Sequence, residues 1–543
     1  GLGDVYKRQI LLNNLRFSED IPSVTDEIAE GHHEVFIIIN LLIQYAKSGD
    51  LNNADGYKGK YLVEVSGRYD GSSKFPIHSK WGFFPSASVA WRISDEPWMG
   101  WSRRALDNAK IRLSAGSMGN GNVDPYSYTS EMTVATASDI VLGGGLPSYT
   151  TVGSTVPVSL TWEKSTTYDV GLDLDFFNNR LSVSGDYYRR YTTDMYTPSI
   201  SLPSVYGTTS PKGNNAELRT TGWELSLTWR DSFKLGGKPF DYSIKAMVWD
   251  SKSVITKYVN DTGSLGTVKG FIENGGSPSS YYVGMTVGEI WGYTVAGLFR
   301  DQADIDSSAI HDFVQASDKV TRPGQVKIAD LDHNGNIDPG AFTADDHGDL
   351  SIIGNINPHY MFGVNLAANW NGIGLSVFLQ GVMKRDWYPS PDSGYFWGKY
   401  ARPFMWVLGI HNYTDDMYSE EKNNWDTAYW PRMTTYQSNS SYSWTKLLEI
   451  PNTRYKQNAA YLRVKNIQVD YTFPKALCQK IRLGGLKIYL SGENLFTFTP
   501  LHKYAPNFDP EALGYDTDFS STAGDGYTYP VLKSVTLGVN ITF

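Results

Sequence analysis

Cysteine is almost missing from this chain of 543 residues, because Cys478 is the only one. A single thiol excludes a disulfide framework and a thiolate metal cluster within one chain, so we expect an inert structural residue. Basic residues are also few, since 48 Lys and Arg face 57 Asp and Glu and leave a net charge of -9. The chain lacks the basic surface that phosphate backbones require, and we expect no nucleic-acid partner.

Long hydrophobic runs are lacking as well. The longest, residues 35–46, is interrupted by Asn40 and Gln44 and is about a third shorter than the roughly 20 residues that a membrane-spanning helix needs. The chain does not open with the basic segment, hydrophobic stretch and small-residue cleavage site of a secretory signal. Because the rest of the sequence looks exported, we expect a fragment whose export signal is lost. Residues 1–56 are interpreted as poorly patterned or non-native.

Aromatic residues, in contrast, are abundant. They make up 14% of the chain, with 36 Tyr and 16 Trp, although the mean hydropathy is only -0.35. This combination fits aromatic girdles around the polar interior of an outer-membrane barrel. It also fits a secreted carbohydrate-binding protein, so composition alone leaves both classes open.

The last nine residues alternate strictly between apolar and polar or small side chains. One face carries Val535, Leu537, Val539, Ile541 and Phe543. A period of two indicates a β-strand, and this strand suits a wall between lipid and a wet lumen. The half-buried last strand of a soluble sandwich would show the same pattern.

The same alternation predicts three hairpins. The clearest turn is Asn371-Gly372, because both positions of such a turn need a positive φ. The predicted pairs are 168–176 with 181–187, 223–229 with 242–248, and 360–370 with 373–379. Further strands are predicted at 61–69, 82–91, 110–116, 461–471 and 486–492.

One of these strands, 461–471, changes its apolar phase partway along. Leu462 and Val464 lie in one phase, whereas Ile467 and Val469 lie in the other. One extra residue in the strand would produce this change, so we predict a bulge near Lys465-Asn466.

Connections between the predicted strands alternate between short and long. Short links lie near 177–179, 231–240, 371–372 and 472–485, and long ones span 118–165, 192–218, 251–358, 384–459 and 493–532. Outer-membrane barrels have tight periplasmic turns and large extracellular loops, whereas a soluble sandwich has no reason to sort its loops this way. The asymmetry favours a barrel and predicts a periplasmic C-terminus.

Six stretches after residue 57 carry a family resemblance through their order and spacing. They are YKGKYLVEVSGRYDGSSKFP (57–76), WGFFPSASVAWRISDEPWM (81–99), AKIRLSAGSMGN (109–120), LTWEKSTTYDVGLDLDFFNNRLSVSGDYYRRYTTDM (160–195), YLRVKNIQVDYTFP (461–474) and SGENLFTFT (491–499). They closely resemble the SusC/RagA family of TonB-dependent outer-membrane transporters.

The resemblance implies an all-β fold in which residues 57–543 form the C-terminal part of a 22-stranded transmembrane antiparallel β-barrel. It further implies import of oligosaccharides or peptides across the outer membrane, with a SusD-like surface lipoprotein as partner and contact with outer-membrane lipid. TonB would act through an N-terminal region whose plug and TonB box are not recognisable here. As a fragment, the chain is not expected to transport alone, because open sheet edges do not persist in lipid.

Two rival functions stay open. A secreted all-β glycan-binding or adhesin-like module would show the same strands without transport. A secreted β-rich hydrolase is less well supported, because no nucleophile, acid–base pair or catalytic metal group stands out, and we predict no enzyme. The nine histidines are dispersed and lack the HExxH spacing of zinc enzymes, so they are expected at the surface.

The segment ADLDHNGNIDPG matches part of a calcium-loop template. Template positions 1, 3, 5, 7 and 9 carry oxygen-bearing side chains and position 6 carries glycine: Asp330, Asp332, Asn334, Asn336, Asp338 and Gly335. Position 12 is Ala341, so Asp345, Asp346 or Asp349 would have to supply the missing carboxylate. The loop is expected either to hold a weak structural Ca²⁺ or Mg²⁺ in an extracellular segment or to form a solvated Asx turn.

Aromatic residues gather in the long segment 384–459. They are Trp387, Tyr388, Tyr395, Phe396, Trp397, Tyr400 and Trp406. Their rings could stack on sugar rings, and Trp397 and Trp406 are the candidate substrate-binding residues. The same side chains could instead form the packed cap of a large loop or contact the lipoprotein.

Overall fold

The computed structural model describes residues 8–11, 35–41, 59–130, 132–137, 141–142, 144–152, 156, 160–198, 212–273, 276–311, 321–389, 396, 416–432, 450–513 and 531–543. Its main element is a sheet with the strand order β1-β2-β3-β4-β5-β8-β9-β10-β11-β16-β17-β20-β21-β22. The chain divides into two compact units. Across the described ranges, no helix combines the length and the apolar character needed to cross a membrane.

The first unit comprises residues 1–223 and 251–260. Its sheet strands are β1 (Arg8–Leu11), β2 (Val35–Leu41), β3 (Tyr61–Gly71), β4 (Trp81–Arg92), β5 (Leu106–Asn120), β8 (Glu163–Phe176), β9 (Leu181–Pro198) and part of β10 (Lys212–Leu235). β1 and β2 pair in parallel, and the pairs from β2 to β9 are antiparallel. Within residues 1–56, expected to be poorly patterned, the described ranges 8–11 and 35–41 are strands.

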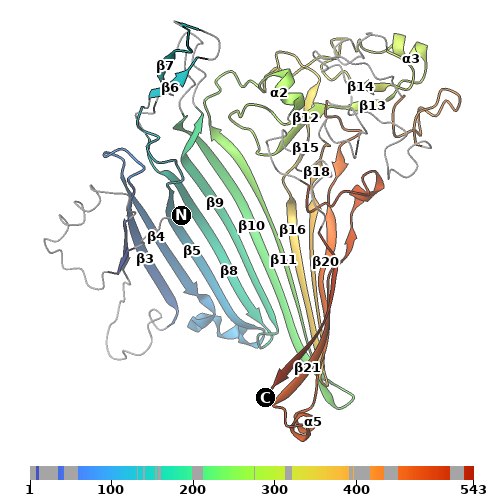
Figure 1. Ribbon diagram of the computed structural model, residues 1–543. Coiled ribbons are helices and arrows are strands. Elements are labelled where there is room, and N and C mark those ends of the chain that lie inside the picture. Colours follow the sequence, from blue (N-terminus) through green and yellow to red (C-terminus); the bar gives the residue numbers. More distant parts are fainter. Residues whose placement is uncertain are drawn as a thin grey trace. The chain divides into compact units, whose positions relative to one another are not determined.

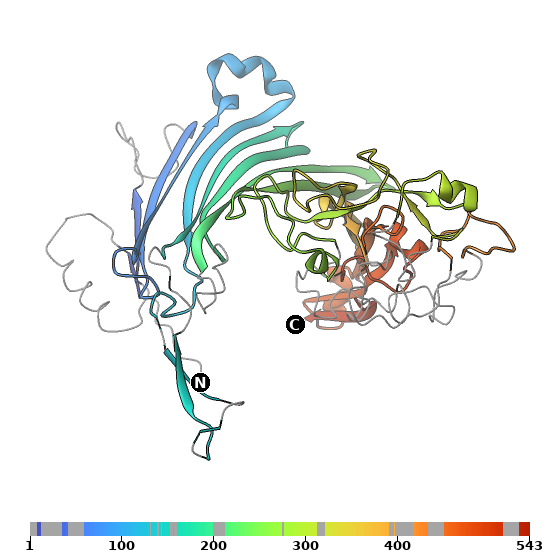
Figure 2. The same ribbon diagram turned by 90° about the horizontal axis from the view of Figure 1, so that it is seen from above.

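Two connections of the first unit have structure of their own. The 3-10 helices η1 (Ile93–Asp95) and η2 (Pro97–Arg104) link β4 to β5. Between β5 and β8, the hairpin of β6 (Met132–Thr136) and β7 (Ser148–Val152) projects beyond the strand ends (Figure 1). The blue-to-green strands β3, β4, β5, β8 and β9 run side by side in both views (Figures 1 and 2).

The second unit comprises residues 224–250 and 261–543. Its sheet strands are the rest of β10, β11 (Lys238–Lys257), β16 (His359–Trp370), β17 (Ile373–Lys384), β20 (Tyr461–Thr472), β21 (Gly485–Phe498) and β22 (Ser534–Thr542). All pairs from β11 to β22 are antiparallel. The C-terminus lies at the same end of this unit as the helix α5 (Lys475–Lys480), which follows β20 and ends at a short turn (Figure 1).

Long insertions occupy the opposite end of the second unit (Figure 1). Between β11 and β16 they contain α2 (Val268–Glu273), β12 (Glu289–Tyr293), β13 (Val295–Leu298), α3 (Gln302–Asp306), β14 (Val326–Ile328) and β15 (Leu350–Asn355). β18 (Asp386–Trp387) pairs with β19 (Gln457–Asn458) between β17 and β20, and η5 (Pro500–Lys503) follows β21. The predicted sorting of long and short connections is therefore present in this unit.

The predicted hairpins are confirmed where register is described. Trp370 pairs with Ile373 across Asn371 and Gly372, whose φ angles are 49° and 91°. Phe176 pairs with Leu181 across a turn in which Phe177, Asn178 and Asn179 all have positive φ. Turn chemistry that accepts positive φ is the local signal that made these hairpins predictable.

The third hairpin is tighter than predicted. β10 ends at Leu235 and β11 begins at Lys238, so the link predicted at 231–240 shrinks to the two glycines 236–237. The ring centroid of Phe233 lies 5.0 Å from that of Phe240 and 6.2 Å from that of Tyr242. These aromatic contacts continue the strands beyond the point where the apolar alternation fades.

Other strands also extend into the predicted long loops. β9 continues to Pro198, β11 to Lys257 and β21 to Phe498, inside the segments predicted as 192–218, 251–358 and 493–532. The backbone ladder does not depend on side-chain polarity, so strands persist where polar residues occupy both faces. The alternation of apolar residues marks only the part of a strand that has one apolar face and one polar face.

The bulge predicted in β20 is confirmed. Phe378 of β17 pairs with Asn466 and Leu379 pairs with Val464, which leaves Lys465 without a partner in that ladder. The register of β20 against β21 also shifts between Val464 and Asn466. The extra residue resets the alternation, as the change of apolar phase indicated.

The two faces of the sheet in the first unit differ in chemistry. On β8, Tyr168, Val170 and Leu172 are 54%, 51% and 42% exposed. On the other face, Asp173 forms ion pairs with Lys110 at 3.0 Å and with Arg112 at 2.9 Å. An exposed apolar face opposite a charged face is the arrangement of a wall between lipid and water.

The largest hydrophobic core lies in the insertions of the second unit rather than on its sheet. Its buried members come from six separate stretches: Ile290, Leu298, Val326, Trp387, Tyr388, Phe396, Met417, Tyr418, Ala428, Trp430, Tyr455, Ala459, Leu501, Ala505, Phe508 and Leu513. We call this set the insertion core. Its aromatic members pack closely, and the ring centroids of Trp430 and Tyr455 lie 5.5 Å apart. The long insertions are therefore packed rather than loose.

Candidate functional site

The predicted cation loop lies between β14 and β15. The structure brings carboxylate oxygens of Asp330, Asp332 and Asp349 within 4.8 Å of one another. Asp349 is thus the one of the three considered replacements for template position 12 that joins the group. Three carboxylates at this distance repel one another unless a cation or protons lie between them.

Asp349 is the buried member of this group, with 0% of its surface exposed. Its oxygens accept hydrogen bonds from the amides of Leu331 at 2.6 Å and Asp338 at 3.0 Å. Burial raises the pKa of Asp349 and the charges of Asp332 and Asp330 add to the rise, which these two amide bonds do not offset. Within the described residues, Asp349 forms no ion pair with lysine or arginine, so this buried carboxylate lacks a positive partner.

Asp330 is held by the turn that follows it. Burial acts to raise its pKa, but hydrogen bonds led by the amide of Gly335, at 2.9 Å, outweigh burial and lower the pKa. Gly335 itself has a φ of +86°, which only glycine adopts readily. The other oxygen, Oδ1, is buried and has no hydrogen-bond partner among the residues that the structure describes. It is free to accept a cation.

The remaining predicted ligands serve the turn itself. The amide of Asn334 donates to Asp332 at 3.0 Å, and the amide of Asn336 donates to Asn334 at 2.7 Å. Asp338 Oδ1 accepts from the amide of Gly340 at 2.8 Å. Asx turns and a carboxylate group therefore coexist, and Asp338 does not join the group of three.

One histidine contradicts the expectation of surface histidines. His311 is only 4% exposed. Its Nδ1 lies 2.6 Å from the carbonyl of Ala309, and its Nε2 accepts from the amide of Ile328 at 3.0 Å. Burial lowers its pKa, so the ring is neutral and acts as a structural link to β14. Isolated histidines give no sequence signal for such a role.

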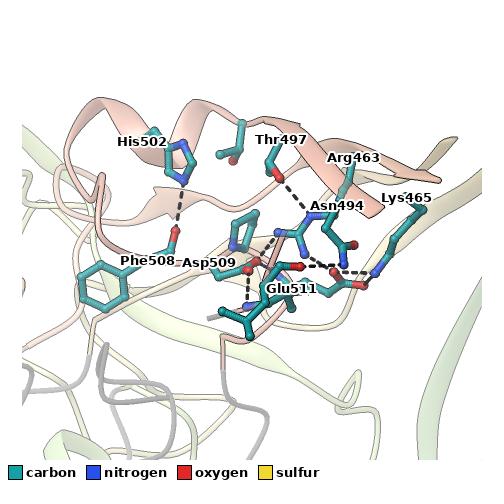
Figure 3. Close-up of polar contacts among 12 residues, drawn as sticks. Arg463, Lys465, Asn494, Thr497, His502, Phe508, Asp509 and Glu511 are labelled. Carbon is teal, nitrogen blue, oxygen red and sulfur yellow. Dashed lines mark hydrogen bonds and ion pairs between the residues drawn. The ribbon is translucent and has the colours of Figure 1, made fainter. Parts of the chain in front are cut away.

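A second polar group, which we call the Arg463 cluster, lies where β20 meets the segment 499–513 (Figure 3). Arg463 is 3% exposed and forms ion pairs with Asp509 and Glu511. Its Nε donates to Thr497 Oγ1 at 3.0 Å, and Lys465 pairs with Glu511 at 2.6 Å. One strand thus presents two cations to one loop.

Arg385 binds the same loop from another direction. Its Nη1 donates to the carbonyl of Pro510 at 2.7 Å and its Nη2 to that of Leu513 at 2.9 Å. Leu501, Phe508 and Leu513 enter the insertion core beneath these contacts. Sequence reasoning did not identify these groups, because the residues that meet lie far apart along the chain. The one sequence signal was a pair of cations flanking Val464 in an otherwise apolar stretch.

Three aromatic residues of segment 384–459 are buried, whereas the sugar-stacking hypothesis requires exposed rings. Trp387, Tyr388 and Phe396 are buried at 7%, 4% and 1% exposure within the insertion core. They belong to a packed cap, as the alternative interpretation held, and are not available to a sugar. Trp397 and Trp406, the candidate substrate-binding residues, lie outside the described residues.

Comparisons with known proteins agree with this architecture. Residues 55–343, more than half of the chain, match the family model described as TonB dependent receptor-like, beta-barrel. The TonB-dependent receptor P26 of Formosa agariphila is 27% identical over 506 residues, which cover 91% of this chain and 46% of that protein. The TonB-dependent receptor SusC of Bacteroides thetaiotaomicron is 24% identical over 517 residues, covering 93% of this chain and 44% of that protein.

Among solved structures, the RagAB peptide transporter superposes with a TM-score of 0.62 at 20% identity, over 90% of this chain and 46% of that one. At this identity the likeness concerns the fold. The chain spans about half the length of the curated relatives that it matches.

Proposed function

Because the chain belongs to the TonB-dependent receptor β-barrel family, we propose that it forms part of an outer-membrane protein that imports a solute with energy supplied through TonB. The observation that carries this proposal is the exposed apolar face opposite a charged face on β8. The predicted fold class, part of a transmembrane antiparallel β-barrel, and the resemblance to SusC/RagA transporters are confirmed. The activity proposed is that of the whole protein.

Oligosaccharides or peptides are the proposed substrates, with a SusD-like surface lipoprotein as the proposed partner. The RagAB structure is that of a peptide transporter, so peptides are included in the proposal beside oligosaccharides. The insertion core is consistent with the proposed lipoprotein partner, because closely packed insertions offer a rigid surface on which another protein can dock. The family is one of receptors and transporters, and we propose no catalytic activity.

Fractionation of cells that produce the complete protein tests this proposal. We expect the protein in the outer-membrane fraction as a heat-modifiable band, and solute uptake that disappears when TonB is deleted. Soluble, detergent-independent protein would instead support the secreted glycan-binding alternative and end the transport proposal. Hydrolysis of any member of a glycan panel by the purified protein would show catalytic activity, which we do not propose.

We also propose that the loop 329–349 binds Ca²⁺, with Asp330, Asp332 and Asp349 as the carboxylate ligands. Support comes from their mutual distance and, among the described residues, from the unpartnered oxygen of Asp330 and the buried carboxylate of Asp349, which forms no ion pair with lysine or arginine. Hard oxygen ligands select a hard cation. Asn334, Asn336 and Asp338 would complete the shell from the turn.

Replacing Asp349 with asparagine is expected to remove calcium binding. The variant keeps the side-chain shape but loses the buried charge, whereas Asp345→Asn changes an exposed carboxylate of the same loop outside the group of three and serves as the matched control. With a Kd of about 1 mM, 10 mM Ca²⁺ would stabilise the loop by about 1.4 kcal/mol. Isothermal titration measures calcium binding by wild type and by both variants. Equal calcium heat in wild type and Asp349→Asn would contradict the site.

Calcium affinity is expected to decrease as the pH is lowered, because the pKa of Asp349 is raised. A carboxyl whose pKa rises on folding takes up a proton more readily when folded, so acid favours the cation-free folded loop. That proton competes with the ion, so affinity is full above the raised pKa and is lost as the pH falls through it. Titrations at about pH 7 and about pH 5 test this, and equal affinity at both would contradict it.

A further inference from the structure

An open groove of about 710 Å³ lies on the apolar face of β4, β5, β8 and β9. One row of cross-strand neighbours explains its shape. Ala87 pairs with Ala115, Ala115 with Tyr168, and Tyr168 with Arg189. Two small residues beside two large ones leave a depression in the wall. The neighbouring row is aliphatic and ends at a tyrosine: Val89, Leu113, Val170 and Tyr187.

Arg189 is the unusual member of this row, because it is an exposed cation on an apolar face. It donates to the hydroxyl of Tyr187 at 3.4 Å. In the part of the chain that the structure describes, no carboxylate forms an ion pair with it. On the polar face, in contrast, Arg112 pairs with both Asp173 and Asp186. Arg189 therefore offers a positive charge that the wall does not neutralise.

The position of Arg189 along β9 places it near one boundary of the apolar band. Eight residues separate it from Leu181, where the strand leaves the short turn, and at about 3.3 Å per residue and a tilt of about 40° they rise about 20 Å. The apolar band of an outer-membrane barrel is about 25 Å tall and is flanked by aromatic girdles. Tyr168, Tyr187 and Tyr191 line the groove beside Arg189, as such a girdle would. If the short turn is periplasmic, this boundary faces the outer leaflet.

We propose that this groove binds one phosphorylated glycolipid of the outer leaflet, of the lipid A type. The inference rests on the proposed outer-membrane location. The lipid phosphate lies against Arg189, whose planar guanidinium suits phosphate oxygens, with the Tyr187 hydroxyl beside it. An acyl chain fills the depression over Ala87 and Ala115. Ser114 and Asp169 also line the groove, but they pair with each other between its two rows, where the alternation of a strand turns side chains to the opposite face. The occupant is a lipid because the two rows are largely apolar and, among the described residues, Arg189 is a cation without an ion pair, which a phosphate complements.

The test uses the complete protein purified into phosphatidylcholine nanodiscs with lipid A added as the probe. Retained lipid A is counted by native mass spectrometry for wild type, Arg189→Gln and Ala115→Phe. Arg190→Gln is the matched control, because Arg190 lies on the opposite face of the same strand, donates to Thr167 and lies over the ring of Tyr188. We expect about tenfold weaker retention in Arg189→Gln, the loss of one charge-assisted contact, and weaker retention in Ala115→Phe because its ring fills the groove.

Dephosphorylated lipid A supplies the second arm. Wild type is expected to retain it about tenfold more weakly than lipid A, and this comparison within the unchanged protein decides the matter even if the variants do not fold. Equal retention by Arg189→Gln and Arg190→Gln, or by wild type whatever the head group, overturns the proposal. Capture of a protein at this face instead of lipid also overturns it. Failure here leaves outer-membrane retention and uptake unchanged, so it is distinguishable from failure of the proposed function.

Discussion

Replacing Arg463 with methionine is expected to release the segment 499–513 from the end of β20 at a cost of about 3–5 kcal/mol in local stability. Arg463 is 3% exposed and pairs with both Asp509 and Glu511. Methionine fills a similar volume but leaves these two carboxylates partly buried without their main cation. Hydrogen exchange of the segment measures the effect as lost amide protection.

The matched control is Arg432→Met. Arg432 also forms a bidentate pair, with Glu420 at 3.1 and 3.2 Å, but the carboxylate is 69% exposed. Exposed pairs contribute about 0–1 kcal/mol, so this variant should change little. Neutralising the carboxylates together with Arg463, by Asp509→Asn and Glu511→Gln, should recover part of the loss, because no unpaired carboxylate then remains partly buried, while Lys465 loses its ion pair with Glu511. Unchanged exchange in Arg463→Met would mean that Arg385 and the insertion core hold the segment without the ion pairs.

Replacing Leu490 with arginine is expected to destabilise the protein in a bilayer by about 2–4 kcal/mol, the cost of a cation near the midplane of the lipid face. Leu490 is 51% exposed on β21 and pairs with Leu537 and Val469. The folded fraction at increasing urea in lipid vesicles, read from the heat-modifiable band, measures this cost.

Ser491→Arg is the control, because the neighbouring side chain lies on the opposite face, where Asn466 donates to the Ser491 hydroxyl at 3.3 Å. A cation there meets water and should cost much less. If both variants lose stability equally, the two faces do not meet lipid and water. The sheet would then have to be covered on both sides by other parts of the protein.

Local patterns made much of the sheet predictable. The period of two located the strands, the positive-φ turn at Asn371-Gly372 located a hairpin, and a change of phase located the bulge at Lys465. Each of these signals lies within about ten residues of sequence. Strand ends were less predictable, because β9 and β10 continue where polarity no longer alternates.

Contacts between distant segments were not predictable from pattern. Arg463 meets Asp509 and Glu511 across 46 and 48 residues, and no periodicity links them. The calcium template identified Asp330 and Asp332, but the third carboxylate was one of three open choices until folding brought Asp349 to the group. The abundance of aromatic residues was equally ambiguous, because counting them does not separate buried side chains from side chains that bind a ligand.

The insertion core has a consequence for how this protein can vary. Its aromatic and aliphatic side chains are shielded from water by one another, so this part of the second unit obeys the rules of a water-soluble domain, while the strands obey those of a lipid-exposed wall. Surface residues of the insertions can therefore be exchanged without touching either the buried rings or the strand pairing. Selection for a new ligand and selection for membrane insertion act on separate sets of residues, which allows recognition to diversify while the wall stays the same.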